Sequence, residues 1–159
     1  MRNLHRGMKL LIVGSGPELA RLQANSLRLG IEDASLFVPA THQVAAYLRA
    51  LDIFVLCSHS EAFSNALLEA MACGCCAVGS SAGGTPELIG SDERGLLCRA
   101  GDPGDLAEKL TMLIQNPQLR KDLGARAAEF ARTGLSIEIA VERTGEIYEN
   151  LLWRKGVPA

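Results

Sequence analysis

The sequence lacks the features that would place it in a membrane or on a nucleic acid. None of its apolar runs approaches the roughly 20 residues needed to cross a bilayer. Its 159 residues carry 16 Lys and Arg against 18 Asp and Glu, with a pI of about 5.9. This balance gives no electrostatic reason to expect a nucleic acid or an anionic membrane as partner. Basic residues open the chain, but no apolar segment with a cleavage site follows them, and we expect no signal peptide.

The sequence also lacks an organised set of metal ligands or disulfide-forming cysteines. Its five cysteines are an odd number, and three of them lie within Cys73–Cys76, unlike a disulfide framework. No second cysteine or histidine pair follows at the spacing of a structural zinc site, and the three histidines show no metal spacing. We therefore predict no metal, no cofactor, small buried thiols in this segment, and a reducing, cytoplasmic compartment. A peripheral position at the membrane stays open for a larger protein that contains this chain.

Short apolar runs alternate with helical patterns through the first two thirds of the chain. The runs predict strands at Lys9–Val13, Ser35–Val38, Asp52–Cys57, Cys75–Gly79 and Arg94–Cys98. Between them we expect helices at Pro17–Leu29, Thr41–Ala50 and Asn65–Cys73, and a helical turn at Glu87–Ile89. Gly30 stops the first helix, and Thr41 caps the second. Strands that alternate with helices indicate parallel pairing with right-handed crossovers.

The last third of the chain is helical throughout. Helices are expected at Asp102–Gln115, at Pro117–Arg132 with a break near Gly124, and at Ser136–Trp153. There is no internal repeat and no linker long enough to separate two domains. We therefore predict an α/β fold over residues 1–159 as a single domain. It consists of a doubly wound parallel sheet followed by a helical C-terminal tail at residues 134–159.

The loops that follow the predicted strands define the candidate site. In open α/β sheets the ligand lies beyond the carboxyl ends of the strands. Four notable loops lie there by this prediction: Gly14–Pro17, Pro39–Thr41, Ser58–Asn65 and Ser80–Pro86. We expect several of them to converge on one cleft.

Glu61 and Glu69 stand on either side of a predicted helix start, with seven residues between them. Glu61 falls in the loop and Glu69 inside the helix. Because Glu69 lies in the mostly apolar segment Leu67–Ala72, we expect its carboxylate to be partly buried and to need partners. Ribose hydroxyls would serve as donors. Both residues could equally be ordinary solvated glutamates, and that alternative stays open here.

The start of this helix also offers a place for an anion. Ser64 and Asn65 can cap it, with free backbone N–H groups and the positive end of the helix dipole directed at the cleft. A cap with nothing bound is the alternative. Further along, Gly83-Gly84 would let the backbone approach a ligand closely, or would simply form a turn into a helix.

Gly14-Ser15-Gly16 resembles the beginning of a dinucleotide-binding fingerprint. The third glycine of that motif is expected three residues after Gly16, where this sequence has Leu19. This departure argues against a nicotinamide cofactor and against an oxidoreductase.

Several motifs in order resemble one family. The segment Ser58–Gly74 contains a serine, then the loop Glu61-Ala62-Phe63, then the helical sequence Leu-Leu-Glu-Ala-Met-Ala at residues 67–72. Gly83–Ile89 resembles that family's Gly-Gly-x-Pro-Glu segment, and Gly95–Leu97 and Gly101–Pro103 resemble its next stretch. The chain is thus similar, from about Leu10 to Leu152, to the retaining glycosyltransferases of the GT-B fold, glycosyl transferases group 1, family 4 type.

The resemblance implies a role for each matched residue. The family's C-terminal domain binds a nucleotide-diphosphate sugar without a metal. By the matched pattern, Glu61 would contact the donor sugar as the catalytic residue, and Glu69 would hold the ribose. The backbone of the loop at Thr41 would touch the nucleobase, and Gly16 would approach the phosphates. The amides that would meet the sugar and diphosphate are those of Phe63, Ser64, Asn65 and Ala66.

The sequence departs from the family pattern in several places. Ala62 and Ser64 stand where Gly is frequent, and Cys75-Cys76 replaces a polar-Pro-Val pair. The Gly-Arg loop and the Lys that neutralise the diphosphate in the family are not reproduced. The resemblance therefore implies a donor-binding domain that lacks its first strand and helix, with its N-terminal acceptor domain as the missing partner.

From these departures we expect weak nucleotide binding and no transfer by this chain alone. An exposed sheet edge should favour a homodimer. The alternative is a non-catalytic nucleotide-binding or scaffold module of the same fold.

Overall fold

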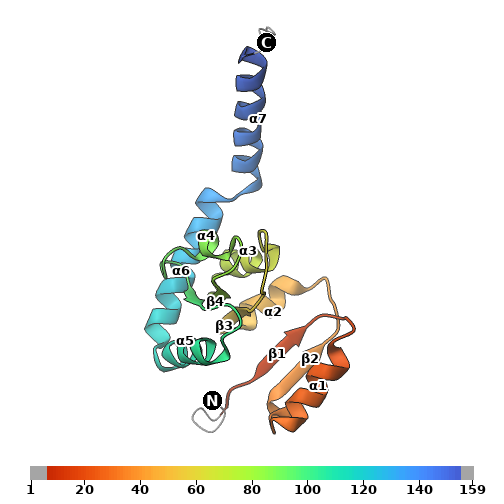
Figure 1. The fold of residues 1–159 in the computed structure, drawn as a ribbon. Coiled ribbons are helices and arrows are strands. Elements are labelled where there is room, and N and C mark those ends of the chain that lie inside the picture. The colour runs from red at the N-terminus through yellow and green to blue at the C-terminus, as the bar shows by residue number, and fades with distance from the viewer. Residues whose placement is uncertain (1–6, 155–159) are drawn as a thin grey trace. The chain divides into compact units, whose positions relative to one another are not determined.

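The computed structural model describes residues 7–154 (Figure 1). The chain divides into two compact units, Met1–Ala46 and Tyr47–Ala159, and each is described by itself. Most of the basic N-terminal arm and the last residues of the predicted 134–159 helix lie outside the described residues. No helix within the described part of the chain is both long and apolar enough to cross a bilayer.

The first unit is built around two parallel strands. β1 (Leu10–Val13) pairs with β2 (Ser35–Val38) along their whole length, and α1 (Leu19–Arg28) and the short 3-10 helix η1 (Glu32–Ala34) connect them. The stop predicted at Gly30 is confirmed. Its φ is 62°, and its N–H donates to the carbonyl oxygen of Leu27 at 2.9 Å. Glycine adopts this backbone conformation at little cost, because it has no Cβ.

The second unit holds a three-stranded parallel sheet in the order β3-β4-β5. Its strands are β3 (Ile53–Leu56), β4 (Cys76–Ser80) and β5 (Leu96–Cys98). All five residues of β4 are buried, as expected for a central strand covered on both faces. The predicted α/β class is confirmed, with the strands paired as one sheet of two and one sheet of three.

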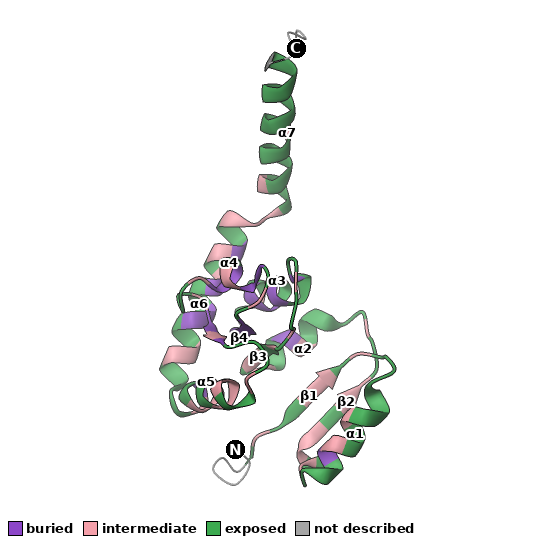
Figure 2. Ribbon diagram, viewed as in Figure 1, coloured by how far each residue is buried: buried purple, intermediate pink, exposed green. Residues whose placement is uncertain are grey.

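Helices cover both faces of the three-stranded sheet. α3 (Asn65–Ala72), α4 (Thr85–Ile89) and α6 (Pro117–Gly134) share a core with Ala77 of β4. On the other face, α5 (Pro103–Gln115) and the first half of α6 pack against Cys76 and Val78. Side chains that alternate along β4 thus enter two separate cores, which gives the doubly wound layering. Figure 2 colours β4 as buried.

The predicted break in the long helix near Gly124 is wrong, because α6 runs through it without interruption. A Cβ at Gly124 would overlap the carbonyl oxygen of Gly74. Glycine is therefore needed here for close backbone approach, and not to end the helix. It lets α6 pack directly on the turn that leads into β4.

The remaining helices follow the expected pattern with small differences at their ends. α2 (Val44–Ala50) contains the boundary between the two units, and it begins three residues later than expected. α7 (Ile137–Arg154) is the last described helix. Most of its apolar residues are exposed, Ile137 to 71% and Trp153 to 83%.

Candidate functional site

The predicted start of α3 at Asn65 is confirmed, and so is the cap. Ser64 is in extended conformation, with φ −82° and ψ 109°, and its Oγ accepts the N–H of Leu67 at 3.3 Å. Because any L-residue adopts this conformation, Ser in place of the frequent Gly costs nothing there and adds a cap. Ser64 is buried, and Asn65 is exposed.

The two faces of α3 separate core residues from candidate ligand residues. Leu67, Ala70 and Met71 are buried, whereas Asn65, Ala66 and Glu69 are exposed. The expectation that Glu69 is partly buried is wrong. Residue 69 lies on the opposite face from its apolar neighbours at 3.6 residues per turn, so its carboxylate reaches solvent.

Both candidate carboxylates are without polar partners among the described residues. Glu61 is half-buried and Glu69 exposed, and across residues 7–154 neither carboxylate takes part in a hydrogen bond or ion pair. They are free to accept hydrogen bonds from a ligand. The backbone at the helix start adds hydrogen-bond donors to these two acceptors. Four consecutive N–H groups find no acceptor among the described residues, namely those of Phe63, Ser64, Asn65 and Ala66.

The Glu61 loop rests on the loop that follows β4. The N–H of Gly84 donates to the carbonyl oxygen of Glu61 at 2.9 Å. A Cβ at Gly83 would overlap that same oxygen, and a Cβ at Gly84 would overlap the carbonyl oxygen of Ala62. These glycines therefore serve contact between two loops. From the sequence we expected Gly83 and Gly84 either to let the backbone approach a ligand or to form a plain turn. Their contact with the Glu61 loop could not be predicted without knowing that β3 and β4 are neighbours.

Two hydrogen bonds connect the ends of the strands. Ser80 Oγ donates to the carbonyl oxygen of Ser58 at 2.5 Å, and the N–H of Ser81 donates to the carbonyl oxygen of Cys98 at 2.8 Å. A Cβ at Gly101 would meet Cε1 of His59 at 3.3 Å, so that imidazole lies against the turn before α5. The loops after β3, β4 and β5 thus meet at one end of their sheet.

The other two predicted loops meet in the first unit. The N–H of Gly14 donates to the carbonyl oxygen of Val38 at 2.9 Å, and that of Ala40 to Ser15 Oγ at 3.1 Å. Gly16 is exposed, with nothing within 4 Å of a Cβ placed on it. Thr41 Oγ1 accepts the N–H of Gln43 at 3.1 Å, inside the turn that precedes α2. Because α2 begins at Val44, Thr41 does not cap it, and the predicted cap is wrong. A single cleft formed by all four loops stays a prediction.

The thiols are placed for packing. Cys75 and Cys76 are buried, Cys73 is only half-buried, and all are reduced. Burial raises the pKa of both the Cys75 and Cys76 thiols to about 11, so they stay protonated and unreactive at neutral pH. Cys75 Sγ donates to the carbonyl oxygen of Leu48 at 3.1 Å. Among the residues described, no group of His, Cys, Asp and Glu could hold a metal ion.

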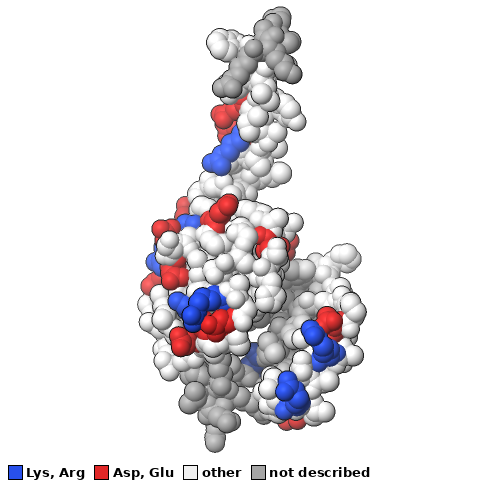
Figure 3. Space-filling model, viewed as in Figure 1, with Lys and Arg blue, Asp and Glu red and all other residues white. Residues whose placement is uncertain are grey.

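The surface of the second unit also has a groove away from the predicted site residues. A groove of about 610 Å³ is lined by residues of the turn before β5 and of α6, none of which is a predicted site residue: Glu93, Arg94, Arg126, Glu129, Phe130 and Thr133. On the face shown in Figure 3, basic and acidic side chains are interspersed. This agrees with the near balance of charge in the sequence.

Parallel strands covered by helices, with free carboxylates and free amides at their carboxyl ends, define an α/β domain of the GT-B type. The chain belongs to the family Glycosyl transferases group 1, whose sequence profile matches residues 1–130.

Relatives agree with this membership. The chain is 37% identical over 144 residues to N-acetyl-alpha-D-glucosaminyl L-malate synthase of Bacillus anthracis, covering 91% of this chain and 38% of that protein. The C-terminal domain of a glycosyl transferase group 1 family protein, LpcC from Francisella tularensis, is 28% identical with a TM-score of 0.77, covering 86% of this chain and 74% of that one. This chain therefore spans less than two fifths of the curated relative.

A third similar structure is HepE from Anabaena in complex with UDP. Its identity is 23% and its TM-score 0.87, covering 92% of this chain and 42% of that chain. The same protein was also solved with UDP-glucose. At this level of identity the likeness shows the shared fold.

Proposed function

We propose that this chain is the donor-binding part of a retaining glycosyltransferase that moves a sugar from a nucleotide-diphosphate sugar to an acceptor. One observation carries the proposal. Two carboxylates without protein partners lie on either side of a helix start whose N–H groups also lack acceptors within residues 7–154. A ligand with hydroxyl groups and a diphosphate complements both sets of groups.

Each group has a definite part in this proposal. Glu69, on the exposed face of α3, accepts hydrogen bonds from the ribose hydroxyls. Glu61 accepts from the donor sugar and is the catalytic residue. The amides of Phe63 to Ala66 meet the sugar and the diphosphate, where oriented donors stabilise the charge that develops on the leaving group. The family resemblance further assigns Gly16 to the phosphates and Thr41 to the nucleobase.

Transfer requires more than these groups supply. The family pattern includes an Arg and a Lys that neutralise the diphosphate, and this sequence does not reproduce them. The acceptor would be held by an N-terminal domain, in keeping with the larger size of the relatives. We therefore propose that this chain binds donor weakly, catalyses no transfer alone, and needs that domain as its partner.

Titration calorimetry tests the proposal. UDP, GDP and ADP are titrated into the protein, with UDP first because HepE of the same fold was solved with it. Glu69→Gln should weaken binding of the preferred nucleotide about tenfold or more, because a hydrogen bond to a charged group contributes about 1.5–3 kcal/mol. Glu146→Gln, an equally exposed change on α7, is the control.

Two results would contradict the proposal. One is binding that Glu69→Gln and Glu146→Gln reduce equally, since only Glu69 lies at the candidate site. The other is affinity for nucleoside diphosphate as tight as that of a complete enzyme, because the missing cations would then not matter.

A further inference from the structure

We infer that the Gly83–Gly84 turn positions the catalytic carboxylate, and that α4 transmits this constraint from the core to Glu61. The inference deepens the proposed function and rests on it. In this role the two glycines do not contact the ligand. They hold the loop that does.

The contact between the two loops leaves no space for a side chain. The N–H of Gly84 donates to the carbonyl oxygen of Glu61 at 2.9 Å. A Cβ at Gly84 would overlap the carbonyl oxygen of Ala62 and lie 3.7 Å from Cα of Phe63. Gly84 has φ −81° and ψ 0°, a conformation open to any residue, so only this packing requires glycine there. Gly83 adds a left-handed φ of 53°.

The turn is anchored firmly on its other side. It leads directly into α4, where Thr85, Leu88 and Ile89 are exposed by 1% or less. Cγ2 of Thr85 and Cδ1 of Ile89 fill the space beside Gly79 of β4. The short helix is thus packed against the central strand and cannot shift without opening the core.

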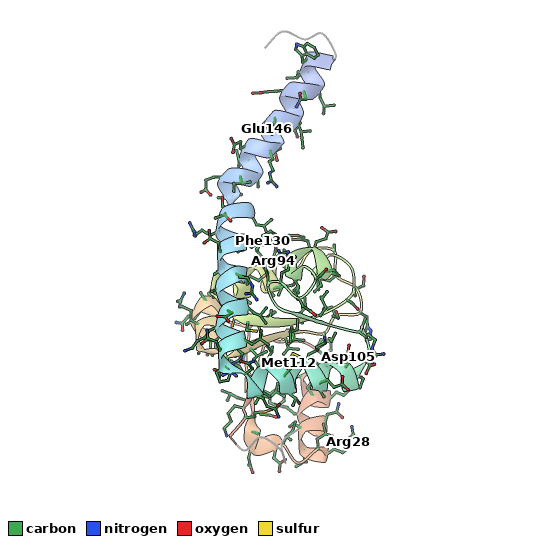
Figure 4. All side chains as sticks on the ribbon, turned by 90° about the vertical axis from the view of Figure 1, so that its left-hand side faces the viewer. Arg28, Arg94, Asp105, Met112, Phe130 and Glu146 are labelled. Atoms are coloured by element: carbon green, nitrogen blue, oxygen red, sulfur yellow. The ribbon has the colours of Figure 1, made fainter. Side chains whose placement is uncertain are left out.

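Arg94 fixes the end of α4. Its Nε donates to the carbonyl oxygen of Leu88 at 2.8 Å, and its Nη2 to that of Glu87 at 3.2 Å. The guanidinium also lies over the ring of Phe130 on α6, with Cζ 3.9 Å from the ring centre (Figure 4). A continuous set of contacts therefore runs from α6 through Arg94 and α4 to the Gly83–Gly84 turn.

This support matters because, within residues 7–154, no polar partner holds the Glu61 side chain in place. Within the described residues its carboxylate has no hydrogen bond or ion pair, so the position of the backbone is what decides which part of the site the side chain can reach. A group that acts on a reacting sugar must be held to within about 0.5 Å. A displaced loop should therefore lose the sugar contact first. The amides of α3 and the Glu69 carboxylate lie on a helix packed through its own buried face, and should keep the nucleotide.

The first test needs no ligand. Gly84→Ala is compared with Gly145→Ala, a glycine on α7 with nothing within 4 Å of its Cβ position. Amide hydrogen exchange and NMR shifts are recorded for both variants. We expect Gly84→Ala to speed exchange at residue 84 on the order of tenfold and to shift the amides of residues 61–63, with Gly145→Ala changing neither. Unchanged amides at residues 61–63 in Gly84→Ala would overturn the inference.

The second test separates positioning from a merely structural role. UDP, GDP and ADP and their glucose conjugates are titrated into wild type, Gly84→Ala, Glu61→Gln and the double variant. The readout is how much tighter the glucose conjugate binds than the bare nucleotide. We expect Gly84→Ala, introduced into the wild-type chain, to abolish most of the preference for the glucose conjugate. Introduced into Glu61→Gln, the same change should alter that preference less than twofold.

The outcomes of the second test are distinct. Additive effects of the two changes would overturn positioning, since the glycine would then act independently of Glu61. Equal loss of bare nucleotide and conjugate in Gly84→Ala would do the same. Absence of nucleotide binding by wild type would overturn the proposed function, and the exchange measurement would still decide whether Gly84 orders the Glu61 loop.

Discussion

At the scale of single residues, the buried hydroxyl of Thr85 lowers the stability of the fold. Thr85 is fully buried, and its Oγ1 has no hydrogen-bond partner among the described residues. Its Cγ2 fills the space beside Gly79. Thr85→Val keeps that methyl group and replaces the unpaired hydroxyl with a second one. We expect the variant to raise the free energy of unfolding by about 1 kcal/mol, because an unsatisfied buried donor costs about 1–3 kcal/mol.

Urea unfolding measures this effect, and Thr111→Val is the matched control. Thr111 Oγ1 donates to the carbonyl oxygen of Ala107 at 2.7 Å, so its loss should lower stability slightly. Destabilisation by Thr85→Val would contradict the prediction and would mean that the hydroxyl has a partner, such as a buried water.

A second residue-scale prediction concerns pH. Backbone N–H groups of Asp105 and Gly104, with Arg99 nearby, hold the pKa of the Asp102 carboxyl below its ordinary value of 3.8. A lowered pKa means that the folded chain favours the ionised form. The stabilisation is therefore complete above the ordinary pKa and is lost as the pH falls through the lower, folded-state pKa.

Asp102→Asn tests this dependence, because Asn also caps helices well and does not titrate. We expect the variant to lose less stability than wild type when unfolding is followed from pH 6 down to about pH 2.5. Parallel losses in both proteins would show that the α5 cap is not among the groups responsible.

At the scale of elements, Gly124 joins α6 to the turn before β4. Its missing side chain allows contact with the carbonyl oxygen of Gly74. Gly124→Ala should lower the free energy of unfolding by about 1–3 kcal/mol, because overpacking outweighs the gain in helix propensity. Gly145→Ala, which meets no atom within 4 Å, should raise it by up to about 1 kcal/mol. A stabilised Gly124→Ala variant would show that α6 can move outward at little cost.

The elements themselves could be predicted well from the sequence, because caps, glycine stops and apolar runs are local signals. β2 has the expected bounds, and α3 begins at the expected residue. The errors share one cause. The break in α6 and the partial burial of Glu69 were inferred from chain neighbours, whereas helix periodicity and packing on another segment decide both. The contact between Gly84 and Glu61 is equally non-local.

The candidate site divides in the same way. Ser64 as the cap of α3 follows from residue type and spacing, and the structure confirms it. The free carboxylates and amides are also consistent with the predicted roles. The support beneath Glu61 could not be predicted, because it depends on two loops that strand order brings together. Sequence patterns identify the groups that carry chemistry more readily than the groups that hold them in place.

At the scale of the whole molecule, exposed apolar side chains predict self-association. Within the first unit, β1 pairs only with β2, and Leu10 on β1 is 45% exposed. We expect light scattering at high concentration to give twice the 17.0 kDa of one chain.

Leu10→Lys should restore the monomer, because charge on an edge strand opposes pairing. Leu27→Lys, on the exposed face of α1 at 66% exposure, should leave the dimer intact. A monomeric wild type would contradict the prediction, and equal effects of both variants would move the interface from the β1 edge to a broader apolar surface.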